Sequence, residues 1–114
     1  MYEDLSVEDY KARFKDGEEA HLLLDVRTVK EFEEARIADA LNIPLDELQE
    51  RTAEVTDAAG DNPIVLVCRS GVRSIMGAQM LRYAGLKDLH LYNLDSGVMG
   101  WAQNGYPLER GAEE

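Results

Sequence analysis

The chain has 114 residues, with 23 acidic and 12 basic side chains and a formal net charge of −11. This length is sufficient for one domain with its own hydrophobic core. The negative charge disfavours nucleic acids and anionic membrane surfaces as partners, because both are themselves negatively charged.

The sequence contains no signal for secretion or membrane insertion that we recognise. No basic segment followed by an apolar core opens the chain, and no apolar run approaches the roughly 20 residues that a membrane helix needs. The single cysteine cannot form a disulfide within the chain. We therefore expect a soluble, cytoplasmic protein whose lone cysteine stays a thiol or carries a transient persulfide.

The first third of the chain predicts a helix, a strand and a second helix. Ser6 is a typical N-cap followed by acidic residues, and Gly17 ends the helix that it begins. Residues 21–26 form an apolar run that is typical of a buried strand. Thr28 can cap the next helix, which reaches Ala35.

The middle of the chain predicts a short strand and a helix. Residues 40–43 have strand character, and Pro44 ends that strand. Apolar residues at helical spacing over residues 45–55 predict a helix that frays into a polar linker at residues 57–63.

The last part of the chain contains the most hydrophobic strand, at residues 64–67. A helix is expected over residues 72–83, a further strand over residues 89–94, and a short helix with Trp101 over residues 97–104. Four side chains of the longer helix are expected to face inward: Ile75, Met76, Met80 and Leu81.

Strands and helices therefore alternate along the chain. Near-continuous apolar strands separated by helices predict an α/β fold, with a parallel sheet covered on both faces. Functional residues are then expected at the carboxyl ends of the strands near a topological switch point, where Cys68 and Asp25 both lie. We expect residues 1–108 to form one domain and residues 109–114 to be a disordered acidic tail.

Cys68, the only cysteine, stands between the apolar run and the helix that follows it. A strand that ends in a tight loop before a helix directs backbone N–H groups and the positive end of the helix at whatever lies over the loop. Gly71 permits the turn, and Arg69 and Arg73 supply positive charge. These features predict that the pKa of the Cys68 thiol is lowered and that Cys68 is a nucleophile.

Four motifs, in this order, resemble those of the rhodanese-like sulfurtransferases of the thiosulfate sulfurtransferase family. They are LLDVR with a following EF at residues 23–32, ALNIP at 40–44, CRSGVRS at 68–74, and LDSG with a following Trp at 94–101. The resemblance extends from about Leu5 to Leu108. It implies the rhodanese-like fold, a mostly parallel central sheet of about five strands flanked by helices on both faces.

Two segments depart from the family pattern. Residues 35–40 lack the two glycines and the histidine that the family usually has before its third strand. Asp39 tolerates a left-handed backbone and is expected to keep the turn there. Ser96 replaces the first of two glycines that are common in the family, which bears on the backbone of that turn but not on the cysteine chemistry.

The resemblance implies a double-displacement reaction at Cys68. Its thiolate attacks the outer sulfur of thiosulfate, a persulfide or a similar donor, and the resulting persulfide passes to cyanide, a small thiol or a protein thiol. Arg73 is expected to be catalytic, because its guanidinium can bind two oxygens of a sulfonate-like anion. Substrate-binding roles are expected for the other residues of the loop, namely Arg69, Ser70, Gly71, Val72 and Ser74. No metal or organic cofactor is implied.

Ser74, at the end of this loop, has two possible roles, whereas two residues near the loop are expected to be structural. Ser74 is either an ordinary hydroxyl at a helix start or a donor to the cysteine sulfur. Asp25 and Arg27 are expected to be architectural, with Arg27 pairing with Glu31 one helical turn on.

Two other functions fit part of the pattern. Cysteine phosphatases and arsenate reductases use a similar loop with five residues between cysteine and arginine, whereas four separate Cys68 from Arg73. The tighter ring of amides suits one added sulfur atom better than a phosphoryl group, and arsenate reduction by a thiol cascade also needs a second cysteine. A non-catalytic sulfur carrier or protein-interaction module remains open, because a carrier uses the same persulfide.

Overall fold

A single sheet of parallel strands forms the centre of the protein, as seen in a computed structural model that describes residues 2–85 and 89–111. Its strand order is β1-β5-β4-β2-β3, and all neighbouring strands run parallel. The strands are β1 (Glu3–Leu5), β2 (Leu22–Asp25), β3 (Leu41–Asn42), β4 (Ile64–Val67) and β5 (Leu91–Leu94). The prediction of an α/β fold with a parallel sheet is confirmed.

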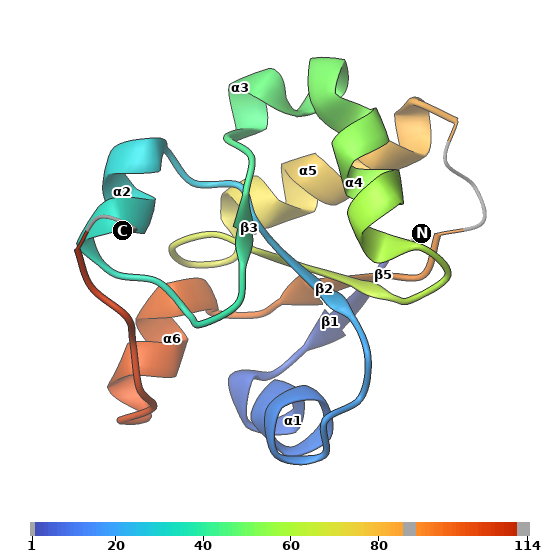
Figure 1. The fold of residues 1–114 in the computed structure, drawn as a ribbon. Helices are drawn as coiled ribbons and strands as arrows, with labels where there is room; N and C mark the ends of the chain where they lie inside the picture. Colours follow the sequence, from blue (N-terminus) through green and yellow to red (C-terminus); the bar gives the residue numbers. More distant parts are fainter. Residues whose placement is uncertain (1, 86–88, 112–114) are drawn as a thin grey trace.

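Helices cover both faces of this sheet (Figure 1). The helical segments are α1 (Val7–Tyr10) with the π-helix η1 (Lys11–Asp16), α2 (Val29–Glu34), α3 (Leu45–Leu48), the 3-10 helix η2 (Gln49–Arg51), α4 (Thr52–Ala59), α5 (Val72–Tyr83) and α6 (Gly97–Gln103). Helices α3, α4 and α5 lie on one face, and α1 and α6 on the other. Within the described residues, no helix has the length and apolar character needed to cross a membrane.

The hydrophobic core has two layers because side chains alternate along each strand. In β4, Ile64 and Leu66 pack with the α3–α5 layer, whereas Val65 and Val67 pack with the α1 and α6 layer. All four side chains are completely buried. A strand buried on both faces in this way has a continuous apolar sequence, which is the pattern that predicted it.

The predicted helix starts are confirmed by their caps. Ser6 Oγ accepts a hydrogen bond from the Asp9 N–H at 3.0 Å. Thr28 and Glu31 form a reciprocal capping box at the start of α2. The predicted turn at Asp39 is also confirmed, since Asp39 has a φ of 68° and Ser96 similarly has a φ of 65°.

Several sequence-based expectations are wrong in detail. Strand β1 was not predicted, and the expected polar linker at residues 57–63 begins inside α4, which extends to Ala59. Met76 was expected to face inward but is 51% exposed. Helix α5 instead packs through the smaller buried side chains Ser74, Gly77 and Ala78, together with Leu81.

The acidic end of the chain contacts the domain over part of its length. Glu109 pairs with Arg36 through two backbone hydrogen bonds of 2.8 and 2.9 Å, and the Arg36 guanidinium donates to the Gly111 carbonyl at 2.7 Å. Residues 109 and 111 thus contact the domain, and residues 112–114 of the expected disordered tail lie outside the described residues.

The sheet has its topological switch point between β2 and β4. These strands are neighbours, with Asp25 opposite Val67. Cys68 follows β4 directly, so Cys68 and Asp25 lie together at the carboxyl edge of the sheet, as predicted.

Candidate active site

Cys68 lies at the floor of the loop between β4 and α5, where its side chain is 1% exposed. Gly71 has a φ of 100°, a left-handed conformation that turns the loop back over the sulfur. The Gly71 N–H donates to Cys68 Sγ at 3.1 Å. The loop thus directs at least one backbone N–H at the sulfur.

Two opposing effects act on the pKa of the Cys68 thiol. Burial raises the pKa, because it disfavours the charged thiolate. Hydrogen bonds from the Ser74 side chain and from the backbone of Ser74, Gly71 and Ser70 lower it and together outweigh burial. The pKa of Cys68 is thus below its ordinary value, the direction expected for a reactive cysteine.

A chain of hydrogen bonds connects the sulfur to strand β1. Asn93 Nδ2 donates to Asp4 Oδ1 at 3.0 Å, and the Ser74 hydroxyl donates to Asn93 Oδ1. Ser74 Oγ also lies 3.4 Å from Cys68 Sγ. A serine hydroxyl has a single hydrogen, so the sulfur and Asn93 compete for it.

The start of helix α6 holds the loop from the other side. The N–H groups of Val98 and Met99 donate to the carbonyls of Cys68 and Arg69, both at 2.9 Å. Gly97 makes this close approach possible, because a Cβ at that position would lie 2.4 Å from the Cys68 carbonyl oxygen. Gly97 also has a φ of 59°. It is therefore a positioning residue for the loop.

Arg73 projects from α5 and forms an ion pair with Glu31 of α2. Its Nη1 and Nη2 atoms lie 2.7 and 2.9 Å from the two carboxylate oxygens. The sequence predicted that this guanidinium binds two oxygens of a substrate anion, and in the structure a carboxylate of the protein takes that position. The pairing raises the pKa of Arg73 and lowers that of Glu31 to about 2.

Arg27 binds a different carboxylate from the one predicted. Its guanidinium pairs with buried Asp25 at 2.8 Å and donates to the Ala35 carbonyl at 2.8 Å. The hydrogen bond found between Arg27 and Glu31 goes to the Glu31 backbone oxygen, at 3.4 Å. The expected Arg27–Glu31 ion pair is thus wrong, while the architectural role of Asp25 and Arg27 fits this buried pair.

The remaining residues of the loop face the solvent. Arg69, Ser70 and Val72 are exposed, Val72 by 66%. Arg69 and Glu31 line a hollow of about 390 Å³, and Arg73 lines a second one of about 340 Å³. Cys68 is not among the residues that line either hollow.

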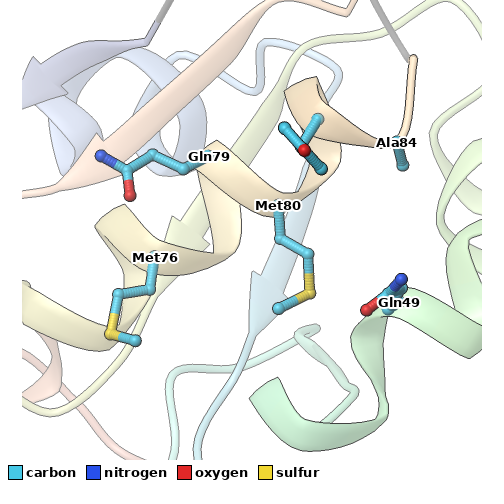
Figure 2. A pocket seen from close by; sticks show the side chains of 6 residues that line it. Gln49, Met76, Gln79, Met80 and Ala84 are labelled. Atoms are coloured by element: carbon cyan, nitrogen blue, oxygen red, sulfur yellow. The ribbon is translucent and has the colours of Figure 1, made fainter.

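A further pocket of about 590 Å³ lies away from the cysteine, between α5 and η2 (Figure 2). Its walls are formed by Gln49, Met76, Gln79, Met80, Tyr83 and Ala84. No carboxylate, cysteine or histidine is among these residues, and Tyr83 is the one titratable side chain among them. Across the described parts of the chain, no group of three or more His, Cys, Asp or Glu side chains is placed to hold a metal ion.

Sequence reasoning missed the contacts that connect distant segments. Asp4 and Asn93 were not selected, and Glu31 was assigned to the wrong arginine. The paired residues Arg73 and Glu31 are 42 positions apart. The sequence contains no local pattern that indicates such pairs, because they depend on which strands are neighbours in the sheet.

Comparisons with known proteins point to one family of domains. The sequence matches the family described as the rhodanese-like domain over residues 6–104. It is 32% identical over 108 residues to a sulfurtransferase of Allochromatium vinosum, with 95% of each chain covered. It is 33% identical over 98 residues to the putative sulfur carrier protein YrkF of Bacillus subtilis, covering 86% of this chain and 50% of that one.

A solved structure supports the same relationship. The thiosulfate sulfurtransferase of Pseudomonas aeruginosa aligns with a TM-score of 0.84 and 28% identity, over 99% of this chain and 21% of that one. The similarity thus concerns one part of a much longer protein.

Proposed function

Because the chain belongs to the rhodanese-like domain family, we propose that it is a sulfurtransferase that moves sulfane sulfur through a persulfide on Cys68. The feature that supports this function is the hydrogen bonding of the Cys68 sulfur by the N–H groups of its loop. Such donors stabilise a thiolate and, after transfer, the terminal sulfur anion of a persulfide. No group other than the loop and the thiol is needed for this chemistry.

The first half of the reaction loads the cysteine. The Cys68 thiolate attacks the outer sulfur of thiosulfate or a related donor, and the S–S bond of the donor breaks. The electron pair of that bond leaves with sulfite, and the outer sulfur stays on Cys68. Arg69, which is exposed, supplies positive charge for the donor and the departing anion, whereas Arg73, at the loop end, can contribute only beside the Glu31 carboxylate that it binds.

The second half returns the enzyme to its thiolate form. A nucleophile such as cyanide or a thiolate attacks the terminal sulfur of the persulfide, and the S–S bond to Cys68 breaks. The electron pair returns to the Cys68 sulfur, and the product is thiocyanate or a new persulfide. No net oxidation or reduction of the protein takes place over the cycle.

A phosphatase reaction is a poorer fit to this loop. Four residues rather than five separate Cys68 from Arg73. The Arg73 fork, which would bind phosphoryl oxygens, is held by Glu31. We therefore expect no useful release of phosphate from an aryl phosphate.

A protein thiol is a plausible partner, because one similar protein is named as a putative sulfur carrier. A carrier and a catalyst form the same persulfide and differ in how fast they release it. Transfer to free thiols at catalytic rates identifies a catalyst. Transfer only to a purified protein acceptor, trapped as a mixed disulfide at Cys68, identifies a carrier.

Steady-state turnover with thiosulfate and cyanide tests the proposed reaction. We expect thiocyanate formation, with parallel double-reciprocal lines when both substrates are varied, because the persulfide forms before the acceptor binds. Cys68→Ser is expected to abolish turnover. Unchanged turnover in this variant, or rapid aryl phosphate hydrolysis by the wild type, contradicts the proposal.

A further inference from the structure

We propose that Glu31 makes this site discriminate against sulfur donors with two negative charges and favour donors with one or none, such as thiosulfonates and alkyl persulfides. This inference rests on the proposed sulfurtransferase function. It starts from the observation that Glu31 occupies both guanidinium nitrogens that an oxyanion would use, at 2.7 and 2.9 Å. A dianion must either displace this carboxylate or approach beside it.

Glu31 is held in place by more than its bond to Arg73. Its carboxylate also accepts from the Thr28 backbone N–H at 3.1 Å and from the Thr28 hydroxyl at 3.2 Å. The bond from the Thr28 N–H is one half of the capping box of helix α2, and the other half is the bond from the Glu31 N–H to Thr28 Oγ1, so turning the carboxylate away would remove the first half. The carboxylate is therefore a fixed part of the wall of the site.

Arg73 and Glu31 offset each other's charge, and the other groups around Cys68 add little positive charge. The Arg27 guanidinium is neutralised by Asp25, and both side chains are buried. Within residues 2–85 and 89–111, Arg69 is the loop arginine for which no ion pair is found, and it is exposed to solvent. The whole chain has a net charge of −11. A single solvated arginine thus faces an otherwise neutral or negative entrance.

A matched pair of donors isolates the effect of charge. Thiosulfate has two negative charges, and methanethiosulfonate has one because a methyl group replaces one oxygen anion. Both donate their outer sulfur to the Cys68 thiolate by the same step, in which the S–S bond breaks and its electron pair leaves with sulfite or with methanesulfinate. Because the two leaving groups also differ in reactivity, the change in the ratio of loading rates when the Glu31 charge is removed is what reports on charge discrimination.

The test is the single-turnover rate of Cys68 persulfide formation with each donor, in the wild type and in Glu31→Gln. Glutamine can also serve in a capping box, so this variant keeps the helix cap while removing the charge. Glu33→Gln, on the exposed side of the same helix, changes the net charge equally without touching Arg73.

We expect the wild type to be loaded faster by methanethiosulfonate than by thiosulfate. Glu31→Gln should raise the thiosulfate rate relative to the methanethiosulfonate rate by about fivefold to tenfold, the effect of one nearby charge in a largely aqueous setting. Glu33→Gln should leave the ratio within about twofold of the wild-type value.

Two results overturn this inference while leaving the proposed function intact. One is a wild type that loads faster from thiosulfate, a result that does not depend on how the variants fold. The other is a Glu31→Gln variant, folded by its thermal transition, whose donor ratio equals that of the wild type. If neither donor loads Cys68 in the wild type, the proposed function fails and this inference fails with it.

Discussion

The reactivity of Cys68 depends on how many hydrogen bonds its buried sulfur receives. Burial alone would raise the pKa of the thiol and keep it inert. The loop amides and Ser74 reverse this effect. The contribution of Ser74 is available only when its single hydrogen turns from Asn93 toward the sulfur.

Replacing Ser74 with alanine should raise the pKa of Cys68, because the thiolate loses a side-chain donor. Since the thiolate is the form that reacts, the pH at which alkylation of Cys68 reaches half its maximal rate should be higher than in the wild type. At neutral pH the rate with iodoacetamide should fall by about threefold to tenfold, the value of one hydrogen bond of roughly 0.5–1.5 kcal/mol.

Ser70→Ala is the matched control for this variant. Ser70 is exposed and acts on the sulfur through its backbone N–H, which alanine retains. Its alkylation profile should equal that of the wild type. An unchanged profile in Ser74→Ala shows that the hydroxyl hydrogen stays on Asn93 in both protonation states.

Single residues were predictable where the local sequence determines their role. Cys68 and Gly71 were identified because a strand, a tight turn and a helix follow one another without interruption. Glu31 and Asn93 were not, because their contacts depend on which strands are neighbours. The capping-box position of Glu31 was a local signal, but it does not indicate that the same carboxylate also binds Arg73.

At the scale of elements, the loop is fixed by the packing of α6 against its carbonyl groups. Gly97 allows this contact, since any side chain would meet the carbonyls of Cys68 and Arg69. Helix α5 fixes the other end of the loop through its small buried side chains. A Cβ at Gly77 would already lie 3.0 Å from Leu66 Cδ2, which shows how closely this helix approaches the sheet.

Gly97→Ala should displace the loop and reduce both stability and persulfide formation. We expect a loss of about 2–4 kcal/mol in the free energy of unfolding, from the left-handed backbone together with the clash. Chemical denaturation and single-turnover loading measure the two effects. Gly105→Ala is the matched control, because Gly105 has a φ of 76° but open space around it.

In Gly105→Ala only the cost of the left-handed backbone remains, so we expect a loss of about 1 kcal/mol in the free energy of unfolding. The rate of persulfide formation on Cys68 should stay normal. Equal losses in the two variants would mean that the α6 contact does not position the loop.

The elements themselves were largely predictable from hydrophobic pattern and caps. Strand β4 and the bounds of α5 follow directly from their sequences. Strand β1 was missed because three residues are too few for a pattern. Met76 was misplaced because apolar residues were taken to mark the inner face of α5, whereas three of its four buried residues are the small Ser74, Gly77 and Ala78.

At the scale of the whole molecule, the net charge of −11 acts on every anionic donor. The acidic side chains repel thiosulfate at long range, and salt screens this long-range repulsion effectively. The loop amides attract the same anion only at short range. The balance between these two effects determines how the loading rate depends on ionic strength.

The rate of persulfide formation from thiosulfate should therefore increase with salt. Between about 0.02 and 0.2 M sodium chloride we expect a rise of about twofold to fivefold, and a smaller rise for methanethiosulfonate. Stopped-flow or quenched-flow loading at constant pH measures it. A rate that falls with salt would indicate that local positive charge at the loop dominates the approach.

The account depends most directly on whether Cys68 accepts one sulfur atom. Intact-protein mass spectrometry after incubation with methanethiosulfonate, followed by peptide mapping, measures this in one experiment. We predict a gain equal to the mass of one sulfur atom, located on Cys68, reversed by cyanide and absent in Cys68→Ser. A wild-type protein whose mass does not change with any sulfane donor, or an equal gain in Cys68→Ser, would contradict it.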